Sequence, residues 1–261
     1  MSETIPPDDS RPSRADADDV AEAAVGVDTR IFITIWDTLI HTPRVLQAAF
    51  DGDRERYIPI LRLFLILFGL QFAIVAFIGL PQAMTLDQFA EPDNADTMTA
   101  WLAGLDYDAV NQTLERTANL SNTALVFLGS LPYLLLLKLY RPKRSFFGHL
   151  LGYLLVTNAS YLVMLPLLLP GAFGEFWLWY IVSMVIGILV YFIAFGRILY
   201  AHYTSKRWLV ALQLLGMVML LPVTLILVAV SQFALAELAV QIFHDRSFLQ
   251  LFALTAEARN S

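Results

Sequence analysis

The chain has 261 residues, of which 57% are hydrophobic and only 15% are charged, which is too apolar for an ordinary soluble domain. Its formal net charge of −6 averages acidic segments against basic loops, and no basic face indicates nucleic-acid binding. The absence of cysteine excludes disulfides, thiolate metal sites and thiol nucleophiles.

Residues 1–28 are acidic, contain proline and lack the apolar core of a signal peptide. Such a segment buries too little apolar surface to offset the entropy lost on ordering, so we predict a disordered tail. A tail that docks on a partner is the functional alternative.

Residues 29–57 are predicted to form an amphipathic helix on the cytoplasmic surface. Its polar residues are spaced seven, four and three apart and therefore share one helical face: Arg30, Asp37, His41 and Arg44. Apolar residues cover much of the remaining surface: Ile31, Ile35, Trp36, Leu39, Ile40 and Leu46. Pro43 is expected to break or kink this helix. The helix either lies in the membrane interface or packs under the spans.

Five apolar runs follow, each long enough to cross about 30 Å of hydrocarbon at about 1.5 Å per residue. They cover about 58–80, 121–140, 146–170, 175–199 and 208–236. We therefore predict an all-α integral membrane protein whose transmembrane domain, residues 58–238, is a five-helix bundle. Pro132, Pro166 and Pro222 are expected to bend the second, third and fifth runs.

Lysine and arginine gather in the loops at one side of these runs, which the positive-inside rule places in the cytoplasm. They are Arg44, Arg54, Arg56, Lys138, Arg141, Lys143, Arg144, Arg197, Lys206 and Arg207. The opposite side carries only Arg116, Arg246 and Arg259. We predict an inner-membrane protein whose N-terminus is cytoplasmic and whose C-terminus is outside.

Two segments are predicted to lie outside. Residues 81–120 form an acidic loop with no calcium-loop spacing, and its second half is a candidate for a helix that continues into the second span. Residues 239–261 form an outer-surface segment whose FLQLFAL stretch is too short to cross a membrane. We predict that this stretch is a second interfacial amphipathic helix.

Polar residues within the predicted spans are few, and none is an acid in a span core, which argues against a proton-coupled pump or antiporter. Arg62 lies near the cytoplasmic boundary, where its charge can reach the headgroups or bind phosphate or substrate. Asn158 lies mid-span beside Thr157 and Ser160, and interhelical hydrogen bonding explains this patch without a substrate. Two pairs of small residues are typical of helix packing: Gly148 with Gly152, and Ser183 with Gly187.

His41, His149 and His202 all fall on the predicted cytoplasmic side. Three histidines can bind a metal ion, but no two of these share a local ligand motif, so we predict no cofactor. No nucleotide loop, nucleophile elbow or HExxH motif is present, so we predict no catalytic residue and no enzyme. The functional candidates are Arg54, Arg56, Arg62, His149, Asn158 and His202.

Three stretches carry a family resemblance: TLIHTPR (38–44) with DGDRERYIP (51–59), RPKRSFFGHL (141–150), and YFIAFGRILYAHY (191–203). They resemble segments of a bacterial membrane family of unknown function, including its basic loop followed by Glu-His. The resemblance implies a bacterial inner-membrane protein with several spans and implies no activity. Many members carry a cysteine zinc ribbon that this chain lacks. Gly148 replaces the family's glutamate before His149, which weakens an acid or metal role there.

Three functions remain open from the sequence. The first is a non-enzymatic scaffold, assembly or regulatory factor for a membrane complex, with the lipid bilayer and a membrane protein or a second copy as partners. The second is a small transporter or channel subunit for a lipid or neutral solute, with a cavity near Asn158 and Gln213. The third is a membrane-embedded enzyme that uses the cytoplasmic histidines, which requires them to meet in space.

Overall fold

The computed structural model describes residues 28–78, 86, 99–174, 176–251 and 253. This part of the chain is all-helical, which confirms the predicted all-α class for it. In chain order the helices are α2 (Arg30–Ile40), α3 (Thr42–Asp51), α4 (Ile60–Ile78), α6 (Tyr107–Tyr140), α7 (Phe146–Leu168), α8 (Phe176–His202) and α9 (Arg207–His244). A short 3-10 helix, η3 (Leu169–Ala172), joins α7 to α8.

Three helical stretches are long and apolar enough to cross a membrane: Phe146–Gly171, Phe176–His202 and Arg207–His244. Two shorter apolar stretches, Ile60–Ile74 and Ala124–Tyr140, coincide with the first and second predicted spans. The predicted tail up to residue 27, the loop residues 79–85 and 87–98, and residues 254–261 lie outside the described residues.

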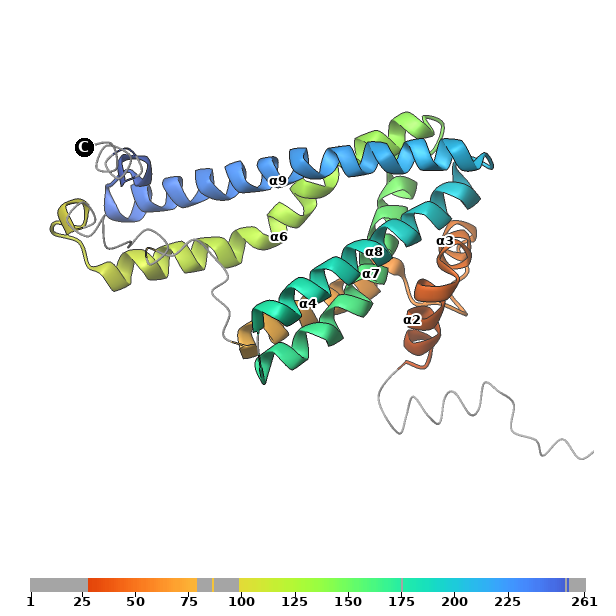
Figure 1. The fold of residues 1–261 in the computed structure, drawn as a ribbon, viewed down its shortest axis with the longest axis horizontal. Coiled ribbons are helices and arrows are strands. Elements are labelled where there is room, and N and C mark those ends of the chain that lie inside the picture. Colours follow the sequence, from red (N-terminus) through yellow and green to blue (C-terminus); the bar gives the residue numbers. More distant parts are fainter. Residues whose placement is uncertain (1–27, 79–85, 87–98, 175, 252, 254–261) are drawn as a thin grey trace, which may run out of the picture.

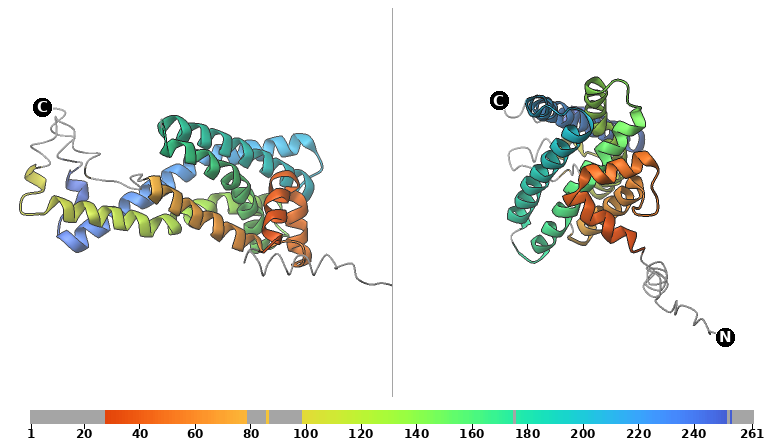
Figure 2. Two further views of the ribbon diagram at one scale, coloured as in Figure 1. Left: turned by 90° about the horizontal axis from the view of Figure 1, so that it is seen from below. Right: turned by 90° about the vertical axis from the view of Figure 1, so that its right-hand side faces the viewer.

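The helices form two groups that share one end. Helices α4, α7 and α8 pack together, and α6 pairs with α9 in antiparallel fashion (Figures 1 and 2). The turns from α6 to α7 and from α8 to α9 lie at the shared end, and α2 and α3 cover the α7–α8 group there (Figure 1). The α6–α9 pair diverges from the other group and extends beyond it (Figure 2).

Helices α6 and α9 are in contact along their length. The Tyr140 hydroxyl donates to the Gln213 carbonyl at 3.0 Å near the shared end, and the Thr113 hydroxyl lies 2.9 Å from His244 Nε2 at the distal end. With 34 and 38 residues, α6 and α9 are about 51 Å and 57 Å long at about 1.5 Å per residue. Both therefore exceed the thickness of hydrocarbon, and α6 begins inside the stretch predicted as the outer loop.

Helix α7 is the most enclosed element of the α4–α7–α8 group. Its core residues include Leu154, Leu155 and Ala159, each at most 3% exposed. Gly187 permits α8 to approach α7 closely. A Cβ at this position would lie only 3.2 Å from the Ser160 hydroxyl oxygen on α7. That hydroxyl donates to the Gly187 carbonyl at 2.9 Å, so a small residue and a polar one together join α7 to α8.

The segment predicted as one interfacial helix is two helices. The expected break occurs at His41, whose backbone (φ −121°, ψ 39°) is not helical, and Pro43 lies in the first turn of α3. Helix α3 ends at Gly52, whose φ of 75° is the left-handed conformation that glycine adopts without strain. Helix α3 packs on α7, where Leu46 lies 3.6 Å from the position that a Gly152 Cβ would take. Gly152 therefore receives α3, whereas a Cβ at Gly148 would meet Arg144 and Ser145 at the start of α7.

The far end of the α6–α9 pair has its own small core, here called the distal cluster. Its buried members are Leu86, Trp101, Val110, Leu114, Ala236, Val240, Phe248 and Leu251. The Trp101 indole donates to the Ser247 carbonyl at 3.0 Å, and the Arg246 guanidinium donates to the Ala103 carbonyl at 3.1 Å. The described part of the C-terminal segment therefore packs on protein, with Phe248 and Leu251 fully buried.

Candidate functional site

A buried carboxylate organises the polar face of α2. Asp37 is 5% exposed and accepts a hydrogen bond from the Tyr57 hydroxyl at 2.6 Å. Its other contacts are His41 Nδ1 at 3.0 Å and Arg56 Nη2 at 3.4 Å. We call these four residues the Asp37 cluster. They attach α2 to the segment that leads into α4, and a further bond from the Ile58 amide to the Thr34 hydroxyl, at 3.1 Å, does the same.

Opposing effects act on the pKa of Asp37. Burial alone would raise it, but the hydrogen bonds from Tyr57 and His41 and the charge of Arg56 hold the pKa below its usual value. Burial, together with the neighbouring Asp37, raises the pKa of Tyr57 to about 12. Near neutral pH the pair is therefore a carboxylate that accepts a bond from a neutral phenol.

A second carboxylate, Asp28, connects the start of α2 to α4. Arg30 donates to it at 2.7 and 2.8 Å, and Arg62 Nη1 lies 3.8 Å from it. The hydrogen bond from Arg30 is the largest of the effects that lower the pKa of Asp28. Arg62, predicted to reach headgroups or substrate, thus has a carboxylate neighbour. Arg54 contributes its carbonyl, which accepts from Arg30 at 2.9 Å, and is exposed.

The Arg144 cluster lies where α3, α7 and the end of α8 meet. The Arg144 guanidinium carbon is 4.5 Å from the centre of the Phe50 ring and 5.3 Å from that of Tyr203. The Tyr203 hydroxyl is 2.6 Å from His149 Nδ1. His202 meets the Phe50 ring edge-on at 5.8 Å, and its Nε2 is 3.1 Å from the Pro43 carbonyl oxygen. Five side chains from four segments thus converge on one point.

Burial raises the pKa of Tyr203 to about 12, although Arg144 acts in the opposite direction. The phenol is neutral near pH 7 and does not balance the charge of Arg144. Among the described residues, no carboxylate lies within ion-pair distance of Arg144.

Polar residues in the middle of α7 bind different neighbours. The Asn158 amide donates to the Ile60 carbonyl at 3.1 Å and so attaches α4. Thr157 donates to the Tyr153 carbonyl at 3.0 Å within α7, while Ser160 reaches α8. The three residues therefore join helices and do not converge on one ligand. The Asn158 carbonyl oxygen, which is buried, has no hydrogen-bond partner among the described residues.

The six sequence-derived candidates divide among these groups. His149 and His202 meet in the Arg144 cluster, Arg56 joins the Asp37 cluster, and Arg62 faces Asp28. His41 lies with Asp37, apart from the other two histidines. Across the described ranges, no group of three His, Asp or Glu is placed to bind a metal ion.

Sequence reasoning missed the residues that hold these groups together, namely Tyr57, Phe50 and Tyr203, and used Arg144 for orientation alone. The available signal was the basic loop at 141–144 directly before a long apolar helix. Comparison of the chain with protein-family models, with curated proteins and with solved structures found no match.

Proposed function

We propose that the chain is a five-span inner-membrane scaffold that docks a membrane-protein helix on α9. The observation that carries this proposal is the exposure of α9, whose central stretch is the most apolar among the three membrane-length helices and is only 6% buried.

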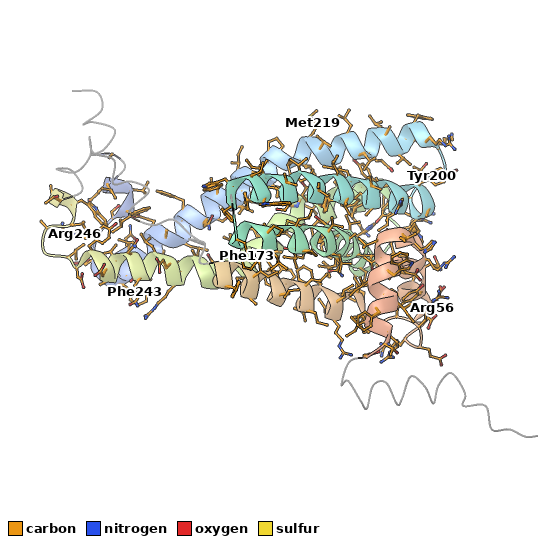
Figure 3. The ribbon with its side chains drawn as sticks, turned by 60° about the horizontal axis from the view of Figure 1, so that its bottom comes forward. Arg56, Phe173, Tyr200, Met219, Phe243 and Arg246 are labelled. Carbon is orange, nitrogen blue, oxygen red and sulfur yellow. The ribbon has the colours of Figure 1, made fainter. Side chains whose placement is uncertain are left out.

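Matching apolar lengths support five spans. Helix α4 has 19 residues, about 28 Å at about 1.5 Å per residue, which is close to the thickness of hydrocarbon. Helix α6 is mainly apolar from Ala124 to Tyr140, and the contacts between α6 and α9 align Ala124 with the level of Ser231. Phe173, 87% exposed at the α7–α8 turn, is typical of an interfacial aromatic residue. Phe243 and Arg246 lie well beyond Phe173, at the distal end (Figure 3).

The exposed face of α2 supports an interfacial position. Helix α2 buries polar side chains, Thr34, Asp37 and Thr38, and exposes Phe32 and Trp36 at 65% and 62%. A helix that turns its polar face to protein and its apolar face outward is stabilised when lipid covers that apolar face. The basic residues at the same end of the molecule favour the inner leaflet.

The absence of cysteine allows a direct test of orientation. Single cysteines replacing the exposed Glu55 or Ser205 should react with a membrane-impermeant maleimide only after the cells are opened. A cysteine replacing Asp108, on α6, should react in intact spheroplasts. All three variants should react fully in detergent, which controls for local accessibility. The reverse labelling pattern would overturn the proposed topology.

An apolar stripe on α9 supports protein docking. Its exposed members are Met219, Val223, Ile226, Val230, Leu238 and Ile242. Lipid can cover the stripe within the hydrocarbon, but Leu238 and Ile242 lie past the level of Ser231, where α9 pairs with the polar half of α6. Exposed apolar side chains in water favour a protein partner. Because Leu238 and Ile242 lie roughly 80–120° around α9 from Val230, the exposed apolar surface winds around the helix and favours a partner helix that crosses α9 at an angle.

Photo-cross-linking in native membranes tests this proposal. Benzoyl-phenylalanine at Leu238 or Ile242 should give the same discrete protein adduct from both positions. The matched controls are Leu189 and Ile193 on α8, which are 57% and 54% exposed and should give none. Leu238→Glu should remove the adduct formed from position 242. An adduct of twice the chain mass would identify a second copy as the partner. No adduct from either α9 position, with the protein folded, would overturn the proposal.

A further inference from the structure

The Arg144 cluster has the features of an anion site that the scaffold function does not use. We propose that Arg144, with Arg141, Lys143 and the N-terminus of α7, binds the phosphate of an anionic phospholipid at the basic end of the molecule. The site is separate from the α9 stripe, so its occupancy does not depend on a docked partner.

The Arg144 side chain is held in place without a counter-charge. Its guanidinium lies against the Phe50 and Tyr203 rings, and its Nη1 atom is buried without a hydrogen-bond partner among the described residues. Its stem folds over Gly148, where a Cβ would lie 3.2 Å from Arg144 Cγ. Lys138 adds charge nearby, since its ammonium donates to the Arg144 carbonyl at 2.7 Å. A buried guanidinium donor without a partner is costly, and a phosphate oxygen supplies the acceptor it lacks.

The surroundings are electropositive. Arg141 and Lys143 are exposed, and no described carboxylate lies within ion-pair distance of either. Both residues precede the first turn of α7. This helix has 23 residues, and its N-terminus favours negative charge. The Ser145 hydroxyl accepts a hydrogen bond from the Gly148 amide at 3.1 Å and so satisfies one of the free amides at this N-terminus.

His149 provides an independent indication of a ligand. It is completely buried, Nδ1 is taken by the Tyr203 hydroxyl, and the ring also lies beside the Arg141 backbone carbonyl, which leaves Nε2 without a well-aligned hydrogen bond among the described residues. It sits on the first turn of α7, beside the Tyr203 ring that contacts Arg144. A buried ring nitrogen without a partner, in a group of uncompensated cations, favours an additional acceptor such as a phosphate oxygen.

The apolar surface beside the cations favours a lipid over free phosphate. Phe146 and Phe147 follow the basic loop directly and are 46% and 62% exposed. An acyl chain can lie against these rings while the headgroup meets Arg144. Inorganic phosphate would use the same charges and gain nothing from the rings.

Gly148 offers a test that changes charge at the site. Gly148→Glu places a carboxylate beside the Arg144 stem, where it should pair with the guanidinium and exclude the phosphate. Gly148→Gln is the matched control of equal size. Lipid binding is measured by native mass spectrometry of the full chain titrated with phosphatidylglycerol, with phosphatidylcholine as reference.

The wild type and Gly148→Gln should retain phosphatidylglycerol in preference to phosphatidylcholine. Gly148→Glu and Arg144→Gln should each weaken that retention about tenfold or more, as expected for loss of a charge-assisted bond. Equal retention by the glutamate and glutamine variants, both folded by hydrogen exchange, would overturn the proposal. Displacement of the lipid by millimolar inorganic phosphate would overturn the lipid assignment. Cross-links from α9 should be unchanged in Arg144→Gln, which separates this inference from the scaffold function.

Discussion

Replacing Glu237 by leucine is expected to unfold the distal cluster while leaving the membrane-spanning part of the chain folded. Glu237 is 9% exposed, and its carboxylate accepts from the Ser247 hydroxyl at 2.9 Å and from the Leu249 amide at 2.8 Å. Gln241 donates to the same carboxylate. Leucine fills the space but removes every acceptor, so these donors lose their partners at a cost of about 3 kcal/mol.

Amide hydrogen exchange in nanodiscs measures this effect. Amides of residues 248–251 and of 107–114 should exchange about 100-fold faster in Glu237→Leu, because about 1.4 kcal/mol corresponds to a factor of ten. Amides of α7 should be unchanged. Glu237→Gln keeps one acceptor oxygen, which can still accept from Ser247 and Gln241, and should lose much less protection. The control is Glu115→Leu, at an exposed position on α6. Equal exchange in Glu237→Leu and the wild type would show that the carboxylate does not hold the cluster together.

The helices that local sequence patterns could predict are those with long, uncharged runs. Helices α7 and α8 were expected near 146–170 and 175–199 and are found at Phe146–Leu168 and Phe176–His202. Helix α9 is longer than expected because apolar residues continue past 236, and the single acid there, Glu237, accepts hydrogen bonds from Ser247 and Leu249 that the sequence does not reveal. Hydropathy reports which residues avoid water, and it does not report where a helix leaves the bilayer.

The candidate sites could be predicted only as residue types. Histidines and arginines predicted to share one side of the membrane were identifiable from loop charges, but their partners lie far along the chain. His149 meets Tyr203 across 54 residues, and Asp37 meets Tyr57 across 20. Such pairs depend on how α7 packs on the end of α8 and how α2 packs on the segment before α4, and no periodic spacing encodes that packing. The break at His41 was predictable, since Pro43 acts locally.

Replacing Asp37 by alanine is expected to detach α2 from the body of the protein. The substitution leaves the buried Tyr57 hydroxyl without its acceptor and frees Arg56 and His41, a loss of about 3 kcal/mol. Amides of α2 should exchange about 100-fold faster at neutral pH, measured in nanodiscs, with little change in α8. Asp51→Ala is the control, because Asp51 is exposed and contacts only Gln47 on its own helix.

The contact between Asp37 and Tyr57 is expected to make the attachment of α2 depend on pH. The lowered pKa of Asp37 means that its stabilisation is present above the usual carboxyl pKa of about 3.9 and is lost as pH falls through the lower, folded-state value. The pKa of Tyr57, raised to about 12, means that its stabilisation is present below about pH 10 and is lost as pH rises toward 12. Fluorescence of Trp36, on the exposed face of α2, should therefore change below about pH 4 in the wild type. Asp37→Asn keeps an acceptor for Tyr57 but has no acid to titrate, so the difference spectrum between the two proteins isolates this transition. An acid transition of equal size in Asp37→Asn would assign it to another group and remove Asp37 as the residue that secures α2.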